Sequence, residues 1–142
     1  MSGRAAVIIY RSRSGRTRQY AEAIGAHLRS RGVETSVSSI GDCDMAALAD
    51  VDLLLLGCWT NGLFVVMQHP DRPWVDFAHD LPPIRGRVGL FTTYQLAAGS
   101  MFRRMRDELR GRTQEPVLEL KSRDGRLSDG GRAALDRFIV GD

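Results

Sequence analysis

AAVIIYRSRSGRT, residues 5–17, is the stretch that decides the fold of this chain. Its first part, residues 5–10, is a nearly continuous apolar run, which is typical of a β-strand covered on both faces. A hydroxyl-rich turn with one glycine follows. Beyond it, Tyr20, Ile24 and Leu28 have the i, i+4, i+8 spacing of one helix face. A strand, a tight turn and a helix in this order predict an α/β protein.

The same alternation continues along the chain. Apolar runs of strand length recur at residues 33–40, 51–57, 88–93 and 117–121, with helical spacing in the segments between them. Strands that alternate with helices pair in parallel through right-handed crossovers. We therefore expect a doubly wound five-stranded parallel sheet with helices on both faces, and we place residues 5–10 and 51–57 in its centre.

Two segments between strands leave room only for short helices. Residues 61–83 contain four prolines, which restricts helix to about residues 74–79. Residues 42–48 fit a similarly short helix between the second and third strands.

The composition is that of an ordinary globular protein. With 142 residues, 43% of them hydrophobic and 26% charged, we expect one domain spanning residues 1–142. The longest apolar run is far shorter than the ~20 residues that span a bilayer, and no signal-peptide pattern precedes the first strand, so a cytoplasmic location is expected. The net charge is +3, but the basic residues are interleaved with 17 acids, so no nucleic-acid partner is expected. The two cysteines and three histidines lack the spacing of a metal site or a catalytic triad, and none is assigned a catalytic role.

Residues 12–17, SRSGRT, form the candidate binding loop. In a doubly wound sheet this turn lies where the first strand ends and the positive end of the first helix dipole begins, a place suited to an anion. Ser12, Ser14 and Thr17 supply hydroxyl groups, and Gly15 lets the backbone close around a phosphate. In an alternative interpretation, Ser14 merely caps the helix. The loop has neither the lysine of a Walker loop nor the three glycines of a dinucleotide fingerprint.

These residues resemble the flavodoxins, whose phosphate loop reads Ser/Thr-x-Ser/Thr-Gly-x-Thr after the first strand. Residues 52–62, DLLLLGCWTNG, resemble the third strand and first flavin loop of that family, and residues 88–94, VGLFTTY, resemble its fourth strand and second flavin loop. The resemblance is to the short-chain branch and covers essentially the whole chain. It implies a flavodoxin-like sheet with the strand order 2-1-3-4-5.

The resemblance also implies a noncovalent cofactor, flavin mononucleotide (FMN). The residues that it implies around the phosphate are Ser12, Arg13, Ser14, Gly15, Arg16 and Thr17. Those that it implies around the flavin ring are Cys58, Trp59, Thr60, Asn61, Gly62, Thr93, Tyr94 and Gln95. Stacking of Trp59 or Tyr94 on the ring would contribute ~1 kcal/mol beyond area burial, although either could be an ordinary core aromatic.

The function that this resemblance implies is electron transfer through the bound flavin to redox partner proteins. An alternative stays open, a flavodoxin-like oxidoreductase that acts directly on a small organic substrate, of the quinone reductase or protoporphyrinogen oxidase type. Leu63 and Phe64 stand where short-chain flavodoxins often have acids. Such an apolar rim could admit a hydrophobic substrate, as that alternative requires, or it could simply pack against Trp74 and Phe77. Arg13 and Arg16 also depart from the family, because flavodoxins usually bind the phosphate without charged side chains.

Overall fold

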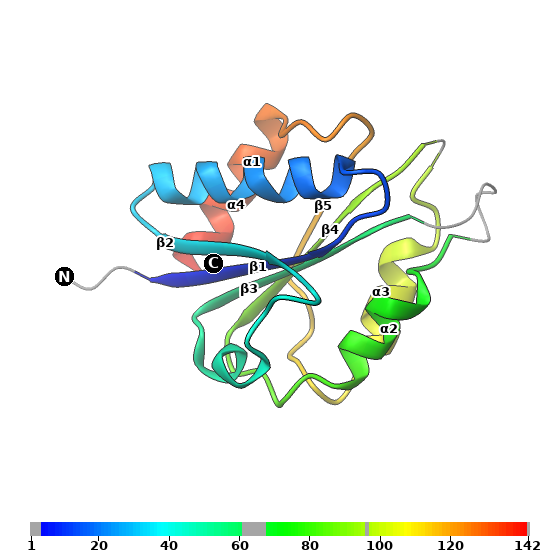
Figure 1. The fold of residues 1–142 in the computed structure, drawn as a ribbon. Helices are drawn as coiled ribbons and strands as arrows, with labels where there is room; N and C mark the ends of the chain where they lie inside the picture. The colour runs from blue at the N-terminus through cyan, green and yellow to red at the C-terminus, as the bar shows by residue number, and fades with distance from the viewer. Residues whose placement is uncertain (1–3, 61–67, 96, 142) are drawn as a thin grey trace.

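The computed structural model describes residues 4–60, 68–95 and 97–141. Figure 1 shows strands and helices that alternate along the chain, as predicted. The strands are β1 (Ala5–Arg11), β2 (Glu34–Ser39), β3 (Leu53–Trp59), β4 (Arg87–Thr93) and β5 (Leu118–Ser122). The helices are α1 (Arg16–Ser30), α2 (Arg72–His79), α3 (Met101–Leu109) and α4 (Asp129–Val140), with a 3₁₀-helix η1 (Met45–Asp50) before β3. Each strand lies within two residues of its predicted bounds.

The sheet is parallel throughout and has the order β2-β1-β3-β4-β5, which confirms the predicted fold class. β3 is the central strand, and β1 lies beside it with β2 on its other side. The register aligns Arg11 with Cys58 and Cys58 with Thr92 at the carboxyl edge of the sheet. Trp59, Thr93 and Ser122 are aligned one step further along. The carboxyl ends of β1, β3, β4 and β5 therefore lie side by side at this edge.

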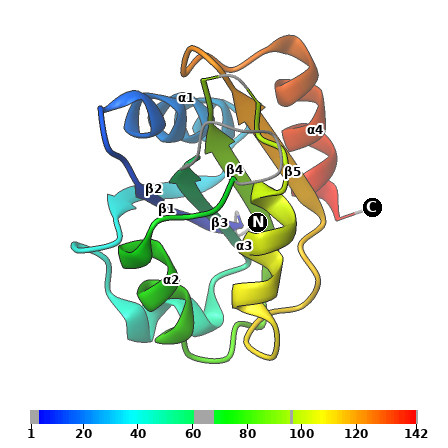
Figure 2. The same ribbon diagram turned by 90° about the vertical axis from the view of Figure 1, so that its right-hand side faces the viewer.

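Helices cover both faces of the sheet (Figures 1 and 2). α1 and α4 pack on one face, where the rings of Tyr20 and Phe91 meet edge to face with centroids 6.0 Å apart. η1, α2 and α3 pack on the other face, where Trp74 is completely buried. A helix layer on each face buries the strands between them, as expected for a doubly wound sheet.

Gly57 is required by the packing of β3 against β4. A Cβ atom at this position would lie 2.1 Å from the nearest ring carbon of Phe91. The glycine therefore lets the Phe91 ring lie directly over the central strand, next to the carboxyl edge.

The two short helices of the second face begin at aspartate caps. Asp71 accepts a hydrogen bond from the Trp74 amide at the start of α2 (3.3 Å), and Pro73 lies in the first turn, so the helix predicted at residues 74–79 begins two residues earlier. Asp44 accepts one from the Ala46 amide (3.2 Å), and the helix that follows is η1, a 3₁₀-helix shifted toward β3. Across the described ranges, no helix has the length and apolar character needed to cross a membrane.

Candidate functional site

The β1–α1 turn is closed by one of its own serines. The Ser12 hydroxyl accepts hydrogen bonds from the amides of Gly15 (3.0 Å) and Arg18 (3.4 Å). Gly15 is the N-cap residue of α1, and no side chain caps the helix from that position, so the capping role considered for Ser14 is wrong. Instead, the Ser12 hydroxyl is the acceptor for two of the amides at this helix end.

Gly15 is needed for its backbone angle. Its φ is +94°, in the left-handed region, and a Cβ atom there would meet nothing within 4 Å. No protein atom would block a side chain at this position, so the left-handed backbone conformation is what requires glycine here.

The remaining amides of this helix end suit an anion. Within the part of the chain that the structure describes, the amides of Arg16 and Thr17 have no protein acceptor. Arg13, Ser14 and Arg16 are exposed beside them. Two open amides, a hydroxyl and two guanidinium groups at the positive end of a 15-residue helix are a donor set that fits a phosphate group.

Thr17 differs from the rest of the loop because its side chain faces inward. Its hydroxyl lies 2.6 Å from that of Thr93 at the end of β4, and both residues are buried. This hydrogen bond joins residues 76 positions apart and ties the loop to residues 88–94, the segment that resembles the second flavin loop.

A second pair of threonines joins β3 to β4. The Thr92 hydroxyl donates to the Cys58 carbonyl (2.6 Å), so the hydroxyl of Thr60, 2.7 Å from it, acts as the donor to Thr92. The Thr60 amide also donates to the Thr93 carbonyl (2.9 Å). These bonds hold the ends of β3 and β4 in a fixed relation at the carboxyl edge.

Asp71 is the centre of a polar cluster that sequence reasoning missed. One of its oxygens accepts from Arg11 Nε (2.8 Å) and from Trp59 Nε1 (2.8 Å). The other accepts from the Cys58 thiol (3.6 Å) and the Trp74 amide. The Asp71 side chain is only 9% exposed, so this carboxylate is satisfied by four donors in a largely buried position.

Arg11 at the end of β1 and Arg13 in the loop that follows make different contacts near Asp71. Arg11 is paired with Asp71, so its charge balances a buried carboxylate. Arg13 lies over the Trp59 ring, with Cζ 5.0 Å from the ring centroid. Trp59 is therefore held at its edge by Asp71 and contacted on its face by Arg13.

Cys58 belongs to the core through its side chain. Its sulfur is buried, and burial raises the pKa of its thiol well above the usual value. The group stays protonated at neutral pH and acts as a donor to Asp71. Any contact of Cys58 with a ligand at the carboxyl edge would be made by its backbone.

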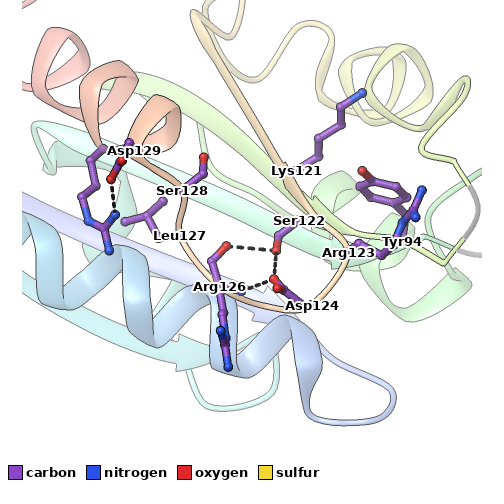
Figure 3. A pocket seen from close by; sticks show the side chains of 10 residues that line it. Tyr94, Lys121, Ser122, Arg123, Asp124, Arg126, Leu127, Ser128 and Asp129 are labelled. Carbon is purple, nitrogen blue, oxygen red and sulfur yellow. Dashed lines mark hydrogen bonds and ion pairs between the residues drawn. The ribbon is translucent and has the colours of Figure 1, made fainter.

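Tyr94 stands at the other side of the candidate site. Its amide donates to the Ser122 carbonyl (3.2 Å), which joins the segment after β4 to the end of β5. Its ring is half-exposed and is approached by Lys121 and Arg123 (Figure 3). Gln95, the next candidate, is exposed.

Two candidates, Asn61 and Gly62, lie outside the described residues, as do Leu63 and Phe64 of the predicted apolar rim. The described candidates gather at the carboxyl edge around the ends of β1, β3 and β4. In the described ranges, no cluster of His, Cys, Asp and Glu side chains is suited to a metal ion.

Comparison with known proteins gives a family and several similar structures. The family model described as Flavodoxin matches residues 8–125. The two-electron reduced flavodoxin of Megasphaera elsdenii has a TM-score of 0.74 at 20% identity, over 96% of this chain and 99% of that one. The oxidised Flavodoxin 1 of Bacillus cereus has a TM-score of 0.69 at 21% identity, over 96% and 95%. A short-chain flavodoxin associated with a bacterial microcompartment has a TM-score of 0.71 at 18% identity, over 97% and 95%. At these identities the structural likeness concerns the fold.

Proposed function

This chain belongs to the flavodoxin family, whose members transfer electrons through a bound flavin, and we propose that it works as a single domain that holds FMN at the carboxyl edge of its sheet. The observation that carries the proposal is the β1–α1 turn, where Gly15 at positive φ leaves the amides of Arg16 and Thr17 open at the start of α1. When bound, the flavin supplies the redox chemistry, and the protein supplies binding, orientation and electrostatics.

The phosphate would be held by the loop residues Ser12, Arg13, Ser14, Gly15, Arg16 and Thr17, in distinct ways. The open amides and the Ser14 hydroxyl offer direct donors, while Ser12 shapes the turn through its bonds to Gly15 and Arg18. Arg13 and Arg16 add positive charge on the exposed side. Charged donors of this kind make FMN binding depend on salt more than neutral donors would.

The ring would be held by the ends of β3 and β4. Asp71 fixes the edge of the Trp59 indole, so the aromatic face does not have to be ordered when a planar ligand binds. The threonine pairs Thr17–Thr93 and Thr60–Thr92 hold the strand ends together beneath this position. We assign positioning roles to these residues and assign no catalytic acid or base.

The proposal is tested by comparing FMN with riboflavin, which has the same ring and no phosphate. The purified protein, incubated with either flavin and desalted, should retain FMN and show its visible absorption. Riboflavin should bind at least about a hundredfold more weakly, because several charge-assisted hydrogen bonds are lost. A protein that retains neither flavin would refute the proposal, and equal affinities would place the phosphate away from the loop.

The alternative function is separated from electron transfer by a second measurement on the FMN-loaded protein. An electron carrier, once chemically reduced, passes electrons to a one-electron acceptor protein in stoichiometric amount. Sustained catalytic turnover of a quinone or a porphyrinogen would instead assign a substrate-specific oxidoreductase.

A further inference from the structure

A group of positive side chains lies beside Tyr94, at the end of β5 and in the segment that leads to α4. We call it the basic surface; it consists of Lys121, Arg123, Arg126 and Arg132, all exposed. Together with Tyr94 they line a hollow of about 640 Å³ (Figure 3). In that view Lys121 and Arg123 lie on the Tyr94 side of the β5–α4 loop, and Arg126 lies on the side of α1.

The basic surface approaches the aromatic side of the candidate flavin site directly. Lys121 Nζ lies 5.9 Å from the centroid of the Tyr94 ring, and Arg123 Cζ lies 5.5 Å from it. A molecule that docks on these cations would therefore contact the region beside Tyr94, where a short electron path to the flavin would be expected.

The carboxylates of this region are already engaged locally. Asp129 is paired with Arg132 (3.0 Å). Asp124 accepts hydrogen bonds from the Arg126 amide (2.9 Å) and from the Ser122 hydroxyl (3.0 Å), and these bonds lower the pKa of its carboxyl group. Among the described residues that line the hollow, the four cations of the basic surface outnumber the two carboxylates, so positive charge is in excess there.

The excess charge is continuous with the phosphate loop. A Cβ atom on Gly125 would lie 3.1 Å from the Arg16 carbonyl oxygen and 3.2 Å from Arg16 Cγ, so the β5–α4 loop packs directly on the start of α1. The exposed Arg16 therefore extends the basic surface toward the candidate flavin site. Residues 94–100, which follow β4 in the sequence, include no acidic residue that would offset the positive charge of the basic surface.

We infer that the basic surface docks an acidic redox protein, which exchanges electrons with the flavin beside Tyr94; this inference rests on the proposed function. Long, exposed cations spread over both sides of a loop are complementary to a broad surface of carboxylates on a protein partner. The docking partner of this chain is therefore a protein whose carboxylates surround its own redox centre.

The test uses one redox protein in two charge states. Cytochrome c is basic, and exhaustive succinylation of its lysines makes it acidic while the haem stays the same. The FMN-loaded protein, chemically reduced, gives one electron to each ferric haem that becomes ferrous, followed by stopped-flow absorbance. At low ionic strength the succinylated form should be reduced at least about tenfold faster than native cytochrome c, and added salt should slow it.

Two variants with the same net charge locate the effect. Lys121→Glu/Arg126→Glu reverses two charges of the basic surface, and Arg85→Glu/Arg110→Glu reverses two exposed charges at the opposite, amino edge of the sheet. The first variant should lower the rate with succinylated cytochrome c by about tenfold or more, while the second should change it by less than about threefold. Equal losses in both variants, or a preference for native cytochrome c, would overturn the inference.

Binding of the flavin-free protein to immobilised succinylated cytochrome c separates this inference from the proposed function. The same order of affinities is expected there: wild type and the Arg85/Arg110 variant bind, and the Lys121/Arg126 variant binds at least about tenfold more weakly. If no flavin is retained but this order holds, the proposed cofactor is wrong and the docking surface stands. If flavin is retained and this order is absent, the docking surface is wrong.

Discussion

The β1–α1 turn and the Asp71 cluster lie at the same edge of the sheet and are built in opposite ways. The turn is closed by hydrogen bonds that the Ser12 hydroxyl accepts from amides three and six positions away. The cluster joins Asp71 to Arg11, 60 positions away, and to Trp59, 12 positions away. The donor set that we propose for the phosphate is thus local to one short segment, whereas the support of Trp59 exists only after β1, β3 and α2 have packed together.

The two regions also use arginine differently. Arg11 balances a largely buried carboxylate and contributes to stability, while Arg16 is exposed beside open amides and is available to a ligand. The comparison predicts that changes in the turn alter flavin affinity with little effect on folding, and that changes at Asp71 alter folding first.

The largest expected effect is on FMN affinity, through Gly15→Asp. A carboxylate about 5 Å from the phosphate, at an effective dielectric constant of about 20, costs about 3 kcal/mol, or roughly a hundredfold in affinity. Fluorescence titration with FMN measures it. The stability of the flavin-free protein should fall by only about 1 kcal/mol, since the left-handed backbone tolerates Asp better than most residues.

Gly15→Asn is the matched control, because asparagine adopts positive φ at a similar cost and carries no charge. Its FMN affinity should remain within about tenfold of wild type. Equal losses in the Asp and Asn variants would mean that backbone strain, and not charge next to a phosphate, determines the result, and the turn would lose its assignment as the phosphate site.

The second effect is on stability, through Asp71→Ala. This change removes the N-cap of α2, worth about 1 kcal/mol, and leaves the Trp59 indole and the Arg11 guanidinium without their acceptor, so we expect a loss of about 3 kcal/mol in urea unfolding. Asp71→Asn keeps an acceptor oxygen and should lose about half as much.

The ratio of FMN to riboflavin affinity makes the same experiment sharper. In Asp71→Asn both affinities should fall, because Trp59 is less well ordered, while their ratio should stay within about twofold of wild type, because the phosphate is held by a turn that closes itself. A ratio that collapses would show that the two regions act as one unit.

The division between local and long-range contacts also separates the features that could be predicted from the sequence from those that could not. The strands and the SRSGRT turn could be predicted because apolar runs and contacts within about six residues determine them, whereas the strand order came from the resemblance to flavodoxins. The hydroxyl that closes the turn could not be identified from the sequence, because hydroxyls two positions apart in one turn offer the same chemistry and only the backbone path selects Ser12 over Ser14. Asp71 carries a signal as a helix cap before Arg72 and Pro73, but its bonds to Arg11 and Trp59 depend on the register of β1 against β3.

The smallest expected effect concerns Asp136, a long-range polar contact far from the carboxyl edge. Its carboxylate accepts from Arg31 (2.9 and 3.2 Å) and lies 2.8 Å from His27 Nε2, which ties α4 to the end of α1. The hydrogen bonds from Arg31, and then the bond to His27, lower the pKa of Asp136 from 3.8 to about 2. A carboxyl pKa that folding lowers adds stability above its unfolded value, and this stability is lost as pH falls through the folded value.

Thermal unfolding of wild type and Asp136→Asn between pH 6 and pH 2 tests this contact. Wild type should have the higher Tm at pH 5 to 6, and the difference should shrink from about pH 4 and be largely lost at pH 2, where about half of the Asp136 carboxyl groups in the folded protein are protonated. At neutral pH the FMN to riboflavin ratio should be unchanged, since α1 meets the flavin only through its other end. A Tm difference that is constant over this pH range would show that the charge of Asp136 does not act, and an altered ratio would show that long-range polar contacts reach the phosphate site after all.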